Sequence, residues 1–137
     1  MTEVPELQPI TVAHARAFWP VVRAELERIR SRCDEEWMPD DVWHEILVGN
    51  AYLWTVGTPE DFGGFCIFQV HATPYRRSLH IWCCSENTEA RAAEYWPQIM
   101  NIAAEASCSH VTIESPRRWQ RALPGLTTRY SYSARVN

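Results

Sequence analysis

The chain has 137 residues, a formal net charge of −4 and a hydrophobic share of 46%, values typical of one soluble domain that buries roughly two-thirds of its unfolded surface. This composition excludes intrinsic disorder, and the negative charge argues against nonspecific nucleic-acid binding. No apolar run approaches the roughly 18 residues of a membrane span, and the first residues are acidic where a signal peptide is basic. We therefore expect a cytoplasmic protein with neither a nucleic-acid nor a membrane partner.

The first half of the chain predicts a strand, two helices and then three strands. Residues 6–10 form a weak first strand, and Thr11 offers its side-chain oxygen as the N-cap of a helix with apolar residues at helical spacing. Pro20 should kink or restart that helix. A second helix covers Pro39–Val48, with proline in its first turn. Three apolar runs then predict strands joined as hairpins: Ala51–Val56, Phe65–Val70 and Leu79–Cys84.

The second half contains a crossover. Asn87 or Thr88 can cap a helix over Ala90–Ala106, which leads to a short strand at His110–Glu114. Two strands joined through a helix should lie parallel. Ser115 then begins a short helix, and strict alternation over the last ten residues predicts a final strand. The expected core comprises Trp54, Phe65, Ile67, Ile81, Trp96, Ile99 and Val111.

The five cysteines contain no Cys-x-x-Cys spacing, so buried reduced thiols are expected. Cys83 and Cys84 are neighbours in a strand and therefore point to opposite faces. They cannot easily share one tetrahedral site with Cys108 and His110. The sequence predicts no metal site.

This order of elements resembles the GNAT acetyltransferase superfamily. The most specific parts of the resemblance are Ala103–Glu114, Arg117–Leu126 and Arg129–Ser133. Together with Asp41–Val56, they make the chain most similar to small GNAT-like proteins encoded in phage and prophage genomes. The resemblance implies one α/β domain over residues 1–137, with a mixed, mostly antiparallel central sheet, helices on both faces and a V-shaped splay between the fourth and fifth strands.

The resemblance also implies where acetyl-CoA would lie. Backbone groups of Trp82, Cys83 and Cys84 would hold the pantetheine arm, because backbone contacts do not depend on sequence. The phosphates would meet the turn that follows. The residues implied there are Ser85, Asn87 and Thr88, with Arg117 and Arg118 as nearby cations.

Two features depart from the family pattern. Glu86 and Glu89 stand where the family has spaced glycines, and two carboxylates would repel a phosphate that a helix N-terminus attracts. The short helix after the fifth strand carries Trp119 and no tyrosine, so the usual proton donor is missing. The remaining candidates for a general base are Glu114 and His80, with Glu86 beside the splay, if their surroundings bring a pKa near 7.

These departures predict a catalytically degenerate GNAT-fold protein with a structural or interaction role, as a virion or assembly component in the bacterial host cytoplasm or in the particle. No cofactor is expected on this interpretation, and acetyl-CoA should bind no more tightly than about 1 mM. A host-directed binding protein would share the same surface chemistry. The alternative is an acyl-CoA-dependent N-acetyltransferase with a non-standard pyrophosphate loop.

A protein partner is suggested by the aromatic content, because seven Trp and five Tyr are many for one small core. Tryptophan, tyrosine and arginine are also enriched at interface hot spots. The partner would be another virion protein or a second copy of the chain. Alternatively, these aromatics fill a core on the second face of the sheet. The predicted patch comprises Trp37, Trp43, Tyr75, Arg76 and Arg77.

Overall fold

The computed structural model describes residues 6–32, 36–114, 123–128 and 134–135. Their central feature is a five-stranded sheet in the order β1-β2-β3-β4-β5. The first four strands pair antiparallel, and β4 and β5 pair parallel, as the predicted crossover requires. The strands are β1 (Gln8–Pro9), β2 (Tyr52–Gly57), β3 (Phe62–Ala72), β4 (Arg77–Cys84) and β5 (His110–Ile113).

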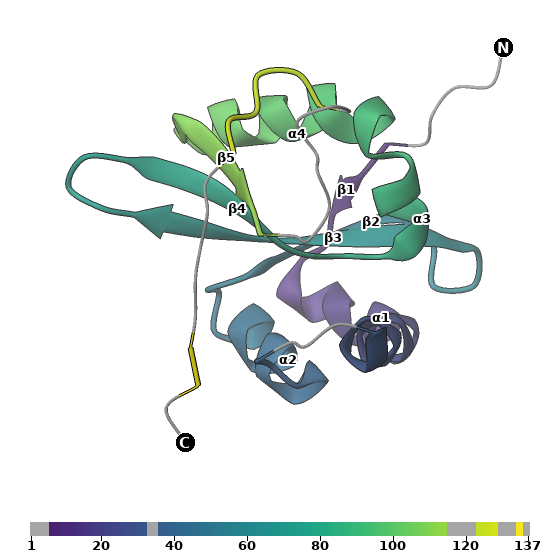
Figure 1. Cartoon of the computed structure of the whole chain (residues 1–137). Coiled ribbons are helices and arrows are strands. Elements are labelled where there is room, and N and C mark those ends of the chain that lie inside the picture. Colours follow the sequence, from purple (N-terminus) through teal and green to yellow (C-terminus); the bar gives the residue numbers. More distant parts are fainter. Residues whose placement is uncertain (1–5, 33–35, 115–122, 129–133, 136–137) are drawn as a thin grey trace, which may run out of the picture.

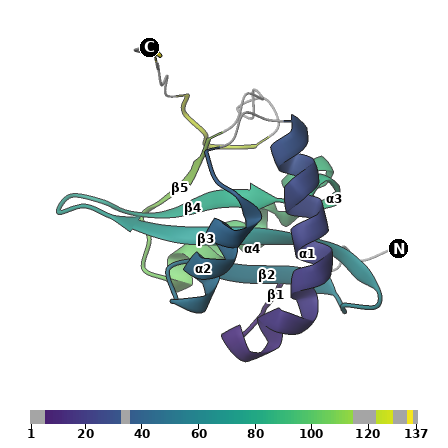
Figure 2. The same ribbon diagram turned by 90° about the horizontal axis from the view of Figure 1, so that it is seen from below.

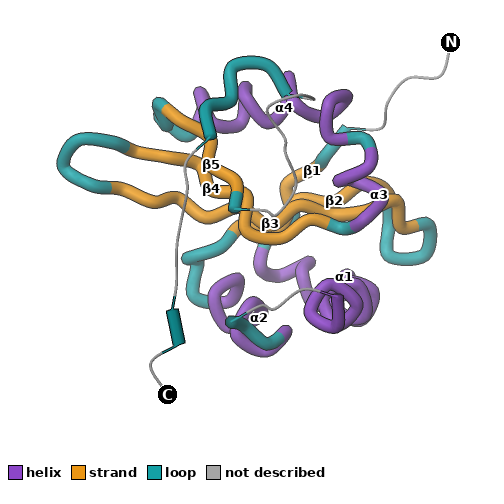
Figure 3. The backbone as a smooth tube through the Cα atoms, in the orientation of Figure 1, coloured by secondary structure: helices purple, strands orange, loops and turns teal. Residues whose placement is uncertain are grey.

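Helices cover both faces of this sheet (Figures 1 and 3). Helices α1 (Val12–Arg32) and α2 (Pro39–Leu47) lie on one face, and Figure 2 shows them across the strands from below. The opposite face carries α3 (Glu86–Ala90) and α4 (Ala92–Glu105). The predicted α/β architecture, mostly antiparallel with helices on both sides, is confirmed.

Each face has its own apolar core. Phe65 and Ile67 of β3 pack with α1 and α2, whereas Trp96 and Ile99 of α4 pack over the other face. All four are at most 6% exposed. Trp54, Ile81 and Val111 are partly buried against the α4 core. The predicted core residues therefore lie where the sequence placed them.

Several boundaries differ from expectation. The backbone N–H of His14 donates to the Thr11 hydroxyl at 3.3 Å, so the first cap is confirmed, but α1 continues through Pro20 without restarting. Ser85, and neither Asn87 nor Thr88, occupies the N-cap position of the next helix. That helix is interrupted at Arg91, which separates α3 from α4. The predicted helix from Ser115 and the final strand fall largely outside the described residues.

Candidate functional site

The sheet opens between β4 and β5. Their parallel pairing runs from Ser78 opposite His110 to Ile81 opposite Ile113 and ends there. Strand β4 continues for three more residues, to Cys84, and of these Cys83 and Cys84 are paired with β3. Within the part of the chain that the structure describes, no strand covers the other edge of these three residues. This open edge of β4 lies where the V-shaped splay was predicted.

A β-bulge shapes the open end of β4. Ile67 of β3 pairs with Cys83, and the next residue, Phe68, pairs with Ile81, so Trp82 is the extra residue. Trp82 and Cys83 both pack on the α1/α2 side, and Cys84 returns to the α4 side. Cys83 and Cys84 thus lie on opposite faces, as predicted. The bulge breaks the alternation one residue earlier, because Trp82 and Cys83 lie on the same face.

The register also fixes where the backbone of Cys84 points. The Ser85 N–H donates to the Phe65 carbonyl at 3.1 Å, which makes Phe65 and Ser85 a hydrogen-bonded pair. The adjacent pair, Cys66 and Cys84, is therefore of the non-hydrogen-bonded kind. In such a pair the backbone N–H and C=O of each residue point away from the partner strand. Those of Cys84 face the gap.

Two imidazoles lie beside the gap on the α1/α2 side of the sheet. His80 is buried, at 7% exposure, and its Nδ1 is hydrogen-bonded to the Thr112 hydroxyl of β5 at 2.8 Å. His71 of β3 stacks on it, with ring centroids 4.7 Å apart and planes inclined by 18°. His80 precedes the last residue of β4 that pairs with β5, so its imidazole is held next to the opening.

The surroundings keep His80 neutral. Burial lowers the pKa of its imidazole and the neighbouring His71 lowers it further, whereas Glu114 raises it and only partly compensates. Glu114 itself is exposed and directly follows β5. The two predicted base candidates are thus close enough to interact electrostatically, and His80 is the more enclosed. The bulge places Cys84 on the opposite face from His80, although regular alternation along β4 would put residues 80 and 84 on the same face.

The turn after β4 is hydrogen-bonded to β3. Ser85 and Thr88 are each 3% exposed, and their hydroxyls are hydrogen-bonded to each other at 3.0 Å. The Phe65 N–H also donates to the Ser85 hydroxyl, at 3.1 Å. A Cβ on Gly64 would lie 2.5 Å from the Thr88 hydroxyl oxygen and 2.7 Å from that of Ser85. The side chains of Ser85 and Thr88, which were predicted to bind the cofactor, are therefore buried in the contact between α3 and β3.

Charges around α3 are more balanced than the sequence indicated. The carboxylate of Glu86 forms an ion pair with the guanidinium of Arg32, at the C-terminal end of α1. This contact offsets one of the two carboxylates expected to repel phosphates. Arg32 precedes Glu86 by 54 residues in the sequence, and no local sequence signal indicates the pairing. The predicted cations Arg117 and Arg118, with Trp119, lie outside the described residues.

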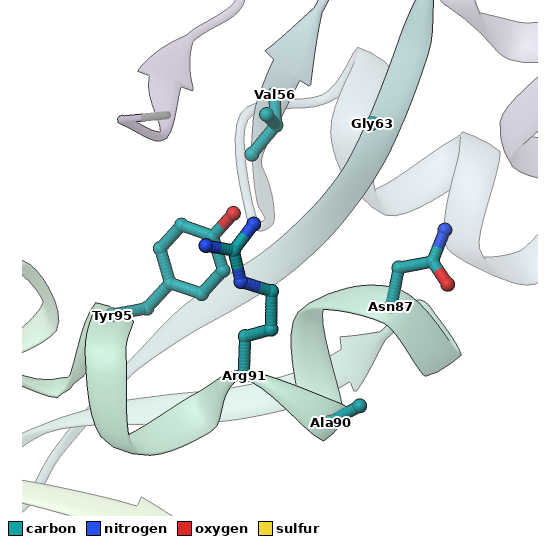
Figure 4. Close-up of a pocket in the computed structure, with 6 residues that line it drawn as sticks. All are labelled: Val56, Gly63, Asn87, Ala90, Arg91 and Tyr95. Carbon is teal, nitrogen blue, oxygen red and sulfur yellow. The ribbon is translucent and has the colours of Figure 1, made fainter. Parts of the chain in front are cut away.

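A separate pocket of about 290 Å³ lies on the α4 side, where β2 and β3 meet the helices (Figure 4). Asn87, a predicted cofactor-binding residue, is one of its lining residues. The Nε of Arg91 donates to the Glu94 carboxylate. Because β3 and β4 separate this pocket from the gap, it is not part of the open edge. The lining residues are Val56, Gly63, Asn87, Ala90, Arg91 and Tyr95.

The residues of the predicted partner patch do not come together. Trp37 is 8% exposed and belongs to the α1/α2 core, with its ring 6.5 Å from that of Trp82. Trp43 is half-buried and packs on Trp19. Tyr75, at 97% exposure, lies in the β3–β4 hairpin, which projects away from α2 in Figures 1 and 2. The placement of Trp37 at the surface was therefore wrong.

The two arginines of that hairpin differ from each other. Arg76 is half-buried, and Arg77 donates from Nε to the Ala106 carbonyl at 2.9 Å.

No cluster of three metal-ligating side chains occurs among the described residues. In the same part of the chain, no helix is long and apolar enough to cross a bilayer.

Comparison with solved structures identifies the fold. An aminoglycoside acetyltransferase from an uncultured soil metagenomic sample superposes with a TM-score of 0.67 at 9% identity, covering 96% of this chain and 95% of that one. A predicted acetyltransferase from Clostridium acetobutylicum, solved with acetyl-CoA, gives 0.66 at 9% identity with 97% of both chains covered. The ribosomal-protein-alanine N-acetyltransferase of Brucella melitensis gives 0.64 at 15% identity, with 98% and 100% covered.

The fold is that of the GNAT acetyltransferases. At these identities the likeness is one of fold. No family model matches the chain, and no curated protein sequence does either.

Proposed function

We propose that the protein is an acyl-CoA-dependent N-acetyltransferase whose thioester substrate lies along the open edge of β4. The observation that carries this proposal is the end of β4–β5 pairing at Ile81 and Ile113, which leaves the backbone groups of Cys84 directed into the gap. An extended amide chain, such as pantetheine, can add to such an edge by main-chain hydrogen bonds. The acetyltransferase folds named above favour this interpretation over the virion component.

The ion pair of Glu86 with Arg32 removes part of the objection to a phosphate beside α3. An uncompensated carboxylate there would repel a diphosphate, whereas a paired one presents a smaller net charge. Acetyl-CoA should therefore bind with a dissociation constant below about 100 μM, rather than at the millimolar level that the sequence suggested.

His80 is the general base in this proposal. In the tautomer that donates Nδ1–H to the Thr112 hydroxyl, Nε2 carries the lone pair that takes a proton from an ammonium or amine acceptor. The lowered pKa keeps the imidazole unprotonated at neutral pH. The deprotonated amine then attacks the thioester carbonyl, a nitrogen–carbon bond forms as the carbon–sulfur bond breaks, and the proton lost by the nitrogen passes to the departing thiolate, giving the amide and free CoA thiol.

Calorimetric titration with acetyl-CoA tests binding, and two charge reversals on α1 locate it. Arg32→Glu should weaken binding several-fold because it leaves Glu86 unpaired and adds a charge beside it. Arg30→Glu changes the net charge equally on the same helix and should leave the affinity within about twofold. Equal losses in both variants, or no binding by the unmodified chain, would contradict the proposed position.

Catalysis is tested by thiol release from acetyl-CoA over a panel of amine acceptors. His80→Gln should lower kcat by about 10²–10⁴, while the matched variant His110→Gln, at an exposed position of β5, should not. Retained turnover in His80→Gln would remove His80 from the mechanism and make Glu114 the next candidate.

A protein-binding role is the second candidate, and the exposure of Tyr75 favours it. An almost fully exposed aromatic at a hairpin tip suits an interface hot spot. Tyr75→Ala should abolish any self-association seen by size-exclusion chromatography without changing the melting temperature. A strictly monomeric wild-type chain would argue against a second copy as the partner.

A further inference from the structure

Two thiols on adjacent strands lie in contact on the α4 side of the sheet. Cys66 of β3 is paired directly with Cys84 of β4, and their sulfur atoms are 2.9 Å apart. Both pack with the core beneath α4, and neither is needed as a side chain in the transfer reaction proposed above.

The backbone at this pair suits a covalent link. Cys66 and Cys84 form a non-hydrogen-bonded pair. In antiparallel sheets the Cα atoms of such a pair lie about 4.5 Å apart, closer than those of a hydrogen-bonded pair. Disulfides accept Cα separations of roughly 4.4–6.8 Å. The Cα positions therefore allow a bridge, and only a side-chain movement is needed to bring the sulfurs to bonding distance.

The two thiols differ in accessibility. Cys66 is completely buried, and its contact with Cys84 together with burial raises the pKa of its thiol. Cys84 is half-buried and ends β4 at the edge of the gap. A small oxidant can reach Cys84 first, and Cys66 is then already in place behind it.

We propose that Cys66 and Cys84 form a peroxide-sensitive dithiol that closes to an intrachain disulfide. The Cys84 thiolate attacks hydrogen peroxide, so a sulfur–oxygen bond forms, the oxygen–oxygen bond breaks and hydroxide leaves as water after taking a proton. The sulfur of Cys66 then displaces the oxygen from Cys84. The hydroxide displaced from Cys84 takes the proton of the Cys66 thiol and forms water. Overall, two thiols and one hydrogen peroxide give one disulfide and two waters.

The product would join β3 to β4 beside the residues that start α3. It would close the loop from Cys66 to Cys84, which contains the turn between β3 and β4 and most of both strands. This link restricts the unfolded chain and raises the melting temperature of the oxidised form. The inference is independent of acetyl-CoA binding, since it depends only on the pairing of the two strands.

Peptide mapping of the folded, reduced chain treated with hydrogen peroxide tests the proposal. After the remaining thiols are alkylated, cleavage at arginine separates the two cysteines because Arg76 and Arg77 lie between them, and cleavage at Glu60 separates Cys66 from Cys33. The expected product is a linked peptide pair lacking two hydrogen atoms. It should disappear on reduction.

Two variants assign the partners. Cys84→Ala should abolish the linked pair and the oxidant-dependent rise in melting temperature. Cys83→Ala, one residue away but on the α1/α2 face, should retain both. The proposal is overturned if wild type gives only sulfinic acid at Cys84, if Cys84 links to another cysteine, or if peroxide leaves both thiols alkylatable.

Discussion

Replacing Gly64 with alanine should disturb the contact that holds α3 against β3. Gly64 has φ +137°, and an added Cβ would lie 2.5 Å from the Thr88 hydroxyl oxygen and 2.7 Å from that of Ser85. The backbone conformation costs an L-residue about 1–3 kcal/mol, and overpacking adds about 1–3 kcal/mol. The free energy of unfolding should fall by about 2–6 kcal/mol, measured by urea denaturation.

Gly49→Ala is the matched control. Gly49 also has a positive φ, +82°, but an added Cβ there would meet nothing within 4 Å. It should carry only the backbone cost, about 1–2 kcal/mol. The reasoning is refuted if Gly64→Ala is no more damaging than Gly49→Ala. As a further check, Thr88→Ala should partly relieve the clash, giving a favourable coupling of at least about 0.5 kcal/mol in a double-mutant cycle.

Three further predictions concern the two cores and the buried histidine. Trp96→Ala should cost about 3–5 kcal/mol in chemical denaturation because the indole is 6% exposed in the α4 core, and a loss under about 1 kcal/mol would place it outside that core. The hydroxyl of Thr55 is buried without a partner among the described residues, so Thr55→Val should raise the free energy of unfolding by about 1 kcal/mol; a decrease would show that the hydroxyl is satisfied. Because the folded pKa of His80 lies below its unfolded value near 6.5, the unfolded chain binds more protons and stability should fall as the pH drops below 6.5. His80→Gln should flatten this dependence of melting temperature on pH, and an unchanged profile would assign it to other groups.

The order of the elements was predictable because most of them have a strong local signal. Thr11 and Pro39 mark helix starts, and the apolar runs of β2, β3 and β4 are bounded by polar turns. The parallel pairing of β4 with β5 followed from the helix between them. The exact helix starts were less accessible, because Ser85 occupies the N-cap position of α3 without a capping hydrogen bond from its side chain, and its hydroxyl contacts Phe65 and Thr88 instead.

The site was predictable only in outline. The bulge at Trp82 leaves no sequence signature, yet it moves Cys84 to the face opposite His80 and alters which groups can act together. The ion pair of Glu86 with Arg32 and the stack of His71 on His80 are made across the fold. The adjacent glycines at 63 and 64 were a readable sign of close backbone approach.

Hydrogen exchange at two neighbouring amides tests the central claim most directly. The Cys83 N–H is directed at β3, since Cys83 and Ile67 form the hydrogen-bonded pair next to Cys66 and Cys84, whereas the Cys84 N–H faces the gap. With saturating acetyl-CoA, exchange at Cys84 should slow by about tenfold or more, while exchange at Cys83 stays slow in both states. Unchanged exchange at Cys84 in the presence of bound acetyl-CoA would contradict the proposed position of the cofactor along β4.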